Sequence, residues 1–134
     1  MAQHIVVPVE IAAHGTPPKT IREYVGAAST GTRAFSVARM TSPPGWSEPA
    51  QCPAFDEVTF VLSGAVVATT GGGGRYEVRS GEALLVRAGE RVQYQTPAGA
   101  EYVAICVPAF TPEAVRRDPE GPGPNSGKGE PRDE

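Results

Sequence analysis

The chain has 134 residues, of which 40% are hydrophobic and 20% are charged. These values predict one domain with a packed core and leave no room for a second. No apolar run reaches the ~18 residues of a membrane-spanning helix. The first residues also lack the basic region and long apolar run of a secretory signal, so none is expected. Two cysteines are too few for a disulfide framework or a four-cysteine zinc site, so we expect a reduced, cytoplasmic protein.

The net charge of −3 comes from residues 118–134, which contain five acidic and two basic side chains. Residues 1–117 therefore sum to zero, with ten acidic and ten basic side chains. A neutral domain without a basic stripe argues against nucleic-acid surfaces and anionic membranes. The expected partner is a small molecule, with no nucleic acid and no membrane.

The predicted elements are mostly short strands separated by Gly, Pro and Ser. Residues 5–9 are a candidate N-terminal strand, and residues 18–26 are ambiguous. Seven later runs are rich in β-branched or aromatic residues and are predicted to be strands: 35–40, 55–62, 65–70, 75–79, 83–87, 91–95 and 101–107. A short helix is predicted at residues 111–117, with Thr111 as its cap.

Short strands with close turns and no long helix between them predict an all-β antiparallel barrel or sandwich. Residues 55–62 are apolar on both faces, so one face needs a core and the other a cover. That cover is either the N-terminal arm or a second subunit, and a homodimer is expected. Residues 118–134, rich in Gly, Pro and charge, are predicted to be a disordered tail.

A motif begins in the run GWSEPAQCPAFDEVTFVLSG. Its spacing is that of the first motif of the cupin family: Gly, five residues, His, one residue, His, three or four residues, Glu, six residues, Gly. Gly45, Glu57 and Gly64 match this pattern. Gln51 and Pro53 stand at the two histidine positions.

The second cupin motif falls on the run GEALLVRAGERV. Gly81 and Gly89 match its glycines, whereas Arg87 replaces a proline and Val92 replaces the third histidine. The chain therefore resembles a small single-domain cupin, and its Phe-Asp-Glu run is similar to that of the ethanolamine-utilisation cupins. The resemblance implies a cupin-type antiparallel β-barrel or jelly roll with a short C-terminal helix, formed by residues 1–117 with an N-terminal arm.

Typical cupins hold a metal ion with three histidines and one glutamate. Here Gln51, Pro53 and Val92 cannot replace the imidazoles, so we expect no metal and no other cofactor. An atypical metal site that uses Glu57, Gln51 and Cys52, or the histidines of the N-terminal arm, stays open as an alternative.

Glu57 and Tyr94 are the candidate catalytic residues. The motif implies that Glu57 projects into an apolar barrel, where burial without a cation raises the pKa of a carboxyl group. Such a group is a usable general acid or base. The equally weighted alternative is that Glu57 only holds the barrel together. Tyr94 lies on the same strand face as Val92 and is either a hydrogen-bond donor to a substrate or a core tyrosine.

Gln51, Arg39 and Trp46 are the candidate substrate-binding residues. Arg39 would pair with Glu57 or with a substrate carboxylate, unless it lies on a solvated outer face. Trp46 would form the wall of the cavity mouth or pack in the core. Cys52 and Cys106 are expected to be buried thiols rather than nucleophiles.

These residues and the resemblance predict a metal-independent enzyme that acts on a small, largely apolar substrate. The expected reaction is cyclisation, isomerisation or elimination by shape and acid–base contacts, as in the cupin-like polyketide cyclases. A non-catalytic ligand-binding cupin and an atypical metal-dependent cupin are the alternatives.

Overall fold

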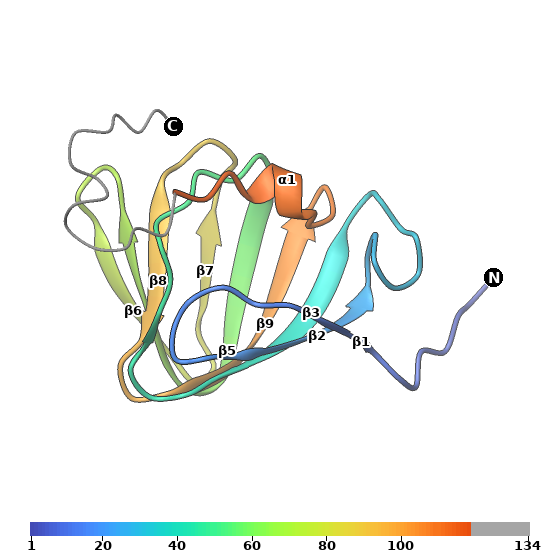
Figure 1. Cartoon of the computed structure of the whole chain (residues 1–134), viewed down its shortest axis with the longest axis horizontal. Coiled ribbons are helices and arrows are strands. Elements are labelled where there is room, and N and C mark those ends of the chain that lie inside the picture. Colours follow the sequence, from blue (N-terminus) through green and yellow to red (C-terminus); the bar gives the residue numbers. More distant parts are fainter. Residues whose placement is uncertain (119–134) are drawn as a thin grey trace.

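The computed structural model describes residues 1–118 of the chain. This part contains nine strands and one short helix (Figure 1): β1 (Val9–Ile11), β2 (Thr20–Val25), β3 (Ser36–Ser42), β4 (Trp46–Ser47), β5 (Asp56–Thr70), β6 (Arg75–Arg79), β7 (Ala83–Val86), β8 (Val92–Thr96), β9 (Ala100–Val107) and α1 (Pro112–Val115). The predicted all-β fold with a short C-terminal helix is confirmed.

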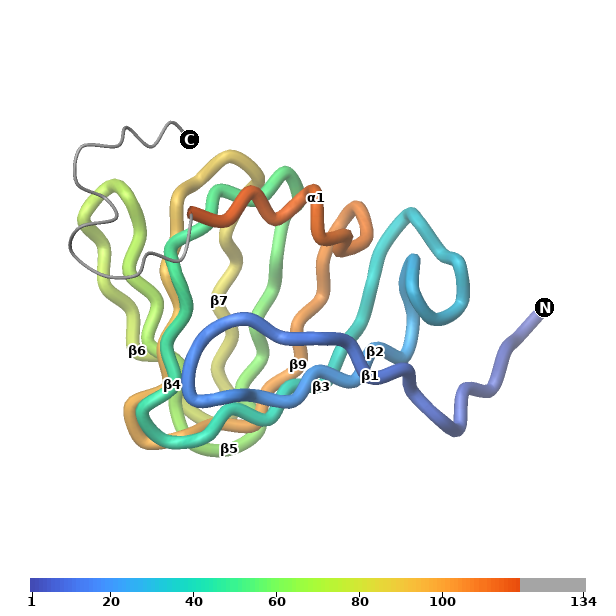
Figure 2. Tube along the Cα trace, viewed as in Figure 1, coloured from blue at the N-terminus to red at the C-terminus, as the bar shows by residue number. Residues whose placement is uncertain are grey.

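The strands form one curved antiparallel sheet in the order β1-β2-β3-β9-β5-β8-β4, with β6 and β7 paired to β5 beside this path. The first half of β5 lies between β9 and β7, and its second half lies between β6 and β8. This curvature gives a half-open barrel. The N-terminal segment crosses its open side, and α1 lies at one end (Figure 2).

β5 joins the two strands predicted at residues 55–62 and 65–70, because Gly64 lets the chain continue through a sharp bend. Gly64 has a φ of +76°, which L-amino acids with a side chain rarely adopt. A Cβ at this position would overlap the carbonyl oxygen of Gly99. One long strand can therefore serve both halves of the barrel.

At the N-terminus the observed strand begins where the predicted one ends, so the prediction of a strand over residues 5–9 is wrong. In this segment only Val9, Glu10 and Ile11 pair with β2, and residues 1–8 extend beyond the edge of the sheet. The ambiguous segment 18–26 contains β2, which turns Ile21 and Glu23 inward.

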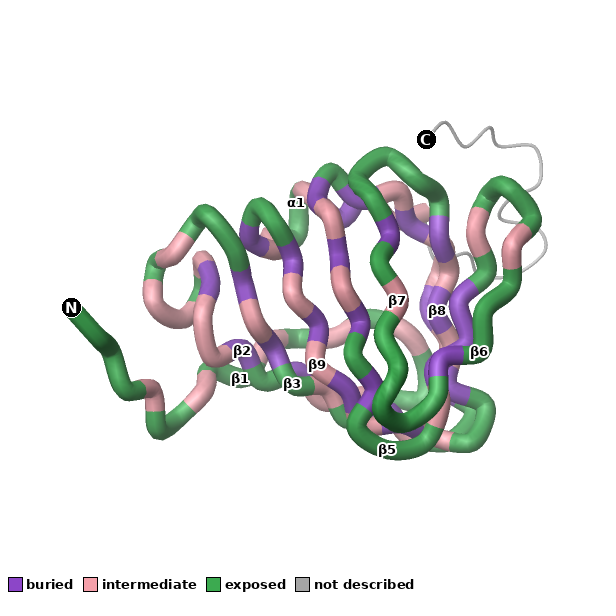
Figure 3. Tube along the Cα trace, turned by 180° about the vertical axis from the view of Figure 1, so that it is seen from behind, coloured by how far each residue is buried: buried purple, intermediate pink, exposed green. Residues whose placement is uncertain are grey.

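The main core lies between the two halves of the barrel. Its members are largely aliphatic and aromatic: Trp46, Val61, Val66, Ala68, Val78, Val86, Val92, Tyr94, Ala100 and Tyr102. A smaller cluster of Phe55, Cys106 and Val115 lies beneath α1. In the first half of β5, buried residues alternate with more exposed ones, as the colours of Figure 3 show. The exposed residues of this strand include the apolar Phe60 and Leu62.

α1 is shorter than predicted because the chain turns back at Arg116, which has a φ of 51°. The hydroxyl of Thr111 accepts a hydrogen bond from the amide of Ala114, as expected for the cap. The Asp118 amide then donates to the carbonyl of Ala50 at 2.8 Å. Asp118 is therefore anchored, and the rest of the predicted tail lies outside the described residues. Within residues 1–118, no helix has the length and apolar character needed to cross a membrane.

Candidate functional site

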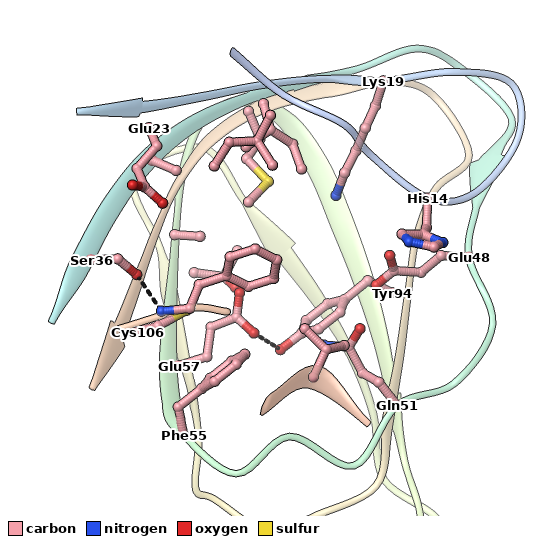
Figure 4. Close-up of a pocket in the computed structure, with 18 of the residues that line it drawn as sticks. His14, Lys19, Glu23, Ser36, Glu48, Gln51, Phe55, Glu57, Tyr94 and Cys106 are labelled. Carbon is pink, nitrogen blue, oxygen red and sulfur yellow. Dashed lines mark hydrogen bonds between the residues drawn. The ribbon is translucent and has the colours of Figure 1, made fainter. Parts of the chain in front are cut away.

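The concave side of the sheet holds a pocket between the N-terminal and C-terminal segments. Its empty space, including the solvent at the open mouth, is about 730 Å³. The lining combines apolar and aromatic side chains with several charged ones, and Figure 4 shows most of them.

Three of the five predicted site residues line this pocket: Gln51, Glu57 and Tyr94. Trp46 is almost fully buried in the main core, so its predicted place at the cavity mouth is wrong. Its ring nevertheless contacts a residue that lines the pocket, because Lys19 Nζ lies 4.1 Å from the centroid of that ring.

Arg39 is not at the pocket. Ala38 and Met40 take the inward positions of β3, which leaves Arg39 on the convex face. There its Nε donates to the carboxylate of Glu101 at 2.7 Å. The predicted pairing of Arg39 with Glu57 or a substrate carboxylate is therefore wrong, since alternate residues of a strand face opposite sides of the sheet.

Glu57 lies on β5, and its carboxylate accepts a hydrogen bond of 3.4 Å from the hydroxyl of Tyr94 (Figure 4). The pKa of Glu57 is raised to about 7, chiefly by burial and also by the charge of the nearby Glu48, although Lys19 acts to lower it. Burial also raises the pKa of Tyr94, so its hydroxyl keeps its proton. Near neutral pH, Glu57 is thus populated in both protonation states, as a group that exchanges protons requires.

The pKa of Glu57 gives a stability prediction. Because the folded protein holds this proton up to about pH 7, its stabilising effect is complete below pH ~4.5 and is lost as the pH rises through 7. A shift of this size corresponds to about 3 kcal/mol. We expect urea unfolding between pH 4.5 and 8 to show this loss in the wild type and not in Glu57→Gln. Equal pH slopes for the two proteins would contradict the assignment.

The sequence did not indicate the charged residues that face Glu57 across the pocket. Arg117 lies near Glu48, with 3.5 Å between its Nη2 and Glu48 Oε1, and near Gln51, with 3.5 Å to its Oε1. Lys19 Nζ donates to the hydroxyl of Tyr102 at 3.3 Å. Burial raises the pKa of Glu48, and both cations lower it.

Two chain segments bring these cations to the pocket. Lys19 follows the loop that crosses the open side of the barrel, and Figure 4 shows it beside His14. Arg117 arrives because the chain after α1 pairs with residues 50–52. The buried Nε of Arg117 has no hydrogen-bond partner within residues 1–118. This donor is available to an acceptor inside the pocket.

Glu23 also lines the pocket, but its carboxylate is satisfied within its own chain. It accepts hydrogen bonds from the amides of Ala28 and Ser29 at 3.0 and 2.9 Å, and from the Ser29 hydroxyl at 2.9 Å. Glu23 therefore fixes the turn after β2 and is separate from the acid–base pair. Cys106 is buried, and burial raises the pKa of its thiol, which does not suit a nucleophile.

Several solved structures with the cupin fold are similar to this chain. A PAC13 variant from Streptomyces, solved with uridine, superposes with a TM-score of 0.69 at 15% identity, over 87% of this chain and 91% of that one. A putative ethanolamine utilisation protein from Salmonella typhimurium gives a TM-score of 0.62 at 14% identity, over 81% of this chain and all of that one. The chain has the cupin fold.

Among curated proteins, the chain is similar to a protein from Myxococcus xanthus named Endoribonuclease YbeY. The two are 46% identical over 106 residues, which are 78% of this chain and 36% of the relative. The chain therefore spans about a third of the length of that protein. No family model matches the chain.

This relative overturns the predicted reaction. Cyclisation, isomerisation or elimination on a largely apolar substrate is wrong, since the curated relative is named for cleavage of RNA. The charged groups inside the barrel give the physical reason. Lys19 and Arg117, which lie outside residues 45–64 and 81–92, make the pocket more polar than those two runs alone had indicated.

The metal ion of typical cupins does not fit the residues at the corresponding positions. Gln51 and Val92 lie opposite each other, joined by two backbone hydrogen bonds of 2.8 Å, so the fold does bring these positions together. Their side chains are an amide and a buried isopropyl group, and Pro53 offers no ligand atom. Residues 1–118 contain no group of three or more His, Cys, Asp or Glu side chains arranged to hold a metal ion. Glu57 alone is too weak a site.

Proposed function

We propose that the barrel binds a ribonucleotide and that Glu57 acts as the base in cleaving its phosphodiester bond. The observation that carries this proposal is that one pocket contains a carboxyl group with a pKa of about 7, that of Glu57, together with two cations, Lys19 and Arg117. A ribonucleotide presents hydroxyl groups, a flat base and an anionic phosphate. The pocket offers a partner to each of these groups.

The ribose hydroxyls suit the polar side of the pocket, where Glu57 and Gln51 provide oxygen acceptors and an amide donor. The base suits the apolar side, where the rings of Phe55 and Phe110 meet edge to face with their centroids 6.2 Å apart. The phosphate suits Arg117, whose buried Nε lacks a partner.

Two relatives support this ligand class. The curated relative is named an endoribonuclease, and the PAC13 structures are solved with uridine. The zero net charge of residues 1–117 suits a nucleotide or the end of a short strand inside the barrel, since binding a long strand to the surface requires many cations.

In the proposed step, the Glu57 carboxylate accepts the proton of a ribose 2′-hydroxyl, and the 2′-oxygen attacks the adjacent phosphorus. The bond between phosphorus and the 5′-oxygen of the next nucleotide breaks, and that oxygen leaves with a proton from solvent. Lys19 and Arg117 stabilise the negative charge that develops on the phosphate oxygens. Tyr94 orients Glu57 through its hydrogen bond.

The test begins with binding, measured as thermal stabilisation and by calorimetry with uridine and with uridine monophosphate. We expect the monophosphate to bind more tightly and Lys19→Met to lower its affinity roughly tenfold while leaving uridine binding almost unchanged. Arg79→Gln, on the exposed strand β6, is the matched control. Absence of binding by either compound at millimolar concentration would overturn the proposal.

A second candidate is a ribonucleotide-binding domain that works beside a separate ribonuclease. The length of the match favours it, because 64% of the Myxococcus xanthus protein lies outside the aligned region. Incubation of the wild type with a short oligouridylate in EDTA separates the two candidates. Cleavage supports the enzyme, whereas tight binding without cleavage supports the binding domain.

A further inference from the structure

The loop between β1 and β2, residues 12–19, is held against β4 at its middle. The backbones of Thr16 and Ser47 exchange two hydrogen bonds of 3.0 Å, and the indole Nε1 of Trp46 donates to the carbonyl oxygen of His14 at 3.1 Å. Gly15, with a φ of +96°, lies so close to β4 that a Cβ there would be 2.5 Å from the carbonyl oxygen of Ser47. The fold therefore gives the backbone of His14 a defined position beside the barrel.

The side chain of His14 lines the pocket at its mouth. It is exposed to solvent, whereas Glu57 is 9% exposed and lies inside the barrel. Figure 4 shows the imidazole beside the carboxylate of Glu48, with the ring of Tyr94 between the imidazole and Glu57. The pocket thus has one group able to transfer a proton at its inner end and another at its outer end.

The two cations of the pocket lie between these ends. Burial raises the pKa of both Glu57 and Glu48, and the charges of Lys19 and Arg117 lower both of these pKa values. The charge of His14 also lowers the pKa of Glu48, so it acts on the outer end of the pocket. Displacement at phosphorus places the attacking and leaving oxygens roughly in line on opposite sides. A phosphate held by the cations, with its attacking oxygen toward Glu57, therefore directs its leaving oxygen toward His14.

We propose that His14 is the general acid of this cleavage and donates a proton to the leaving 5′-oxygen. The inference rests on the proposed function, and it supplies a protein group for a proton that otherwise comes from solvent. The imidazolium gives one N–H proton to the 5′-oxygen as the bond from this oxygen to phosphorus breaks, and the electron pair of that bond stays with the oxygen. His14 is left neutral and Glu57 holds the proton of the 2′-hydroxyl, until both exchange with solvent. Imidazole is well suited to give and take a proton near neutral pH.

Two substrates that differ in their leaving group test this role. The 5′-oxygen of a short oligouridylate needs a proton to leave, whereas the nitrophenolate of the para-nitrophenyl ester of uridine 3′-phosphate leaves without one. We expect His14→Gln to slow cleavage of the oligouridylate at least about a hundredfold and to leave cleavage of the ester almost unchanged. His4→Gln, at the second of the two histidines of the chain, is the matched control and is expected to keep both rates. His4 is exposed in residues 1–8, beyond the edge of the sheet.

Glu57→Gln gives the contrasting result, because both substrates need the 2′-oxygen to be activated: it is expected to slow both reactions. Equal rates of His14→Gln and the wild type on the oligouridylate would overturn the role of His14. Equal slowing on the two substrates would also overturn it, since His14 would then act in binding or positioning. If the wild type cleaves neither substrate in EDTA, the proposed function itself fails, and the role of His14 fails with it. Circular dichroism and binding of uridine monophosphate show that each variant is folded before its rates are compared.

Discussion

Glu57→Gln is expected to slow cleavage of a short oligouridylate at least about a hundredfold, the usual contribution of a general base. The amide has nearly the shape of the carboxyl group but neither accepts nor releases a proton near neutral pH. The measurement is the rate of product release under saturating conditions, followed by chromatography. Glu77→Gln, the same chemical change on the exposed strand β6, is expected to keep the full rate.

The same variant separates loss of chemistry from loss of fold. Since glutamine resembles the protonated form of Glu57, we expect the variant to be at least as stable as the wild type at pH 8. A folded variant with an undiminished cleavage rate would remove Glu57 from the reaction. Reduced cleavage accompanied by equal loss of nucleotide binding would instead assign Glu57 to recognition.

Gly64→Ala is expected to lower the free energy of unfolding by about 4 kcal/mol, because backbone strain and overpacking add at this position. The added methyl group meets the carbonyl of Gly99 and the Cα of Ala100. The φ of +76° also disfavours a residue with a side chain. Urea unfolding at fixed pH and protein concentration measures the change.

Gly72→Ala is the matched control for this prediction. Gly72 lies in the loop between β5 and β6, and no atom lies within 4 Å of a Cβ built there. We expect its unfolding free energy to stay within about 0.5 kcal/mol of the wild type, as for ordinary surface positions. Equal stability of the two variants would show that the bend in β5 tolerates a side chain.

Local patterns in the sequence predicted much of the fold. Strands such as β6 and β9 follow from β-branched residues between turn residues, and the motif spacing placed Gln51 and Glu57 on one side of the barrel. Because side chains alternate along a strand, Arg39 faces the opposite side of the sheet from Ala38 and Met40. Which of the two sides is concave depends on the strands beside β3, so the local sequence alone did not place Arg39.

The cationic part of the pocket could not be predicted in this way. Arg117 and Gln51 are 66 positions apart, and they meet only because the chain turns at Arg116 and pairs beside residues 50–52. Lys19 lies in the segment of residues 18–26, whose local sequence is compatible with more than one type of secondary structure. Such long-range contacts depend on the closure of the whole barrel, which no single motif encodes.

The loop of residues 12–19 connects β1 to β2 and carries both His14 and Lys19 into the pocket. The pairing of β1 with β2 holds the two ends of this loop together and reduces the number of conformations that the loop samples while the pocket is empty. Ordering the loop in advance lowers the entropy that ligand binding must overcome. Ligand affinity and the pairing of β1 with β2 are then thermodynamically linked, so each strengthens the other.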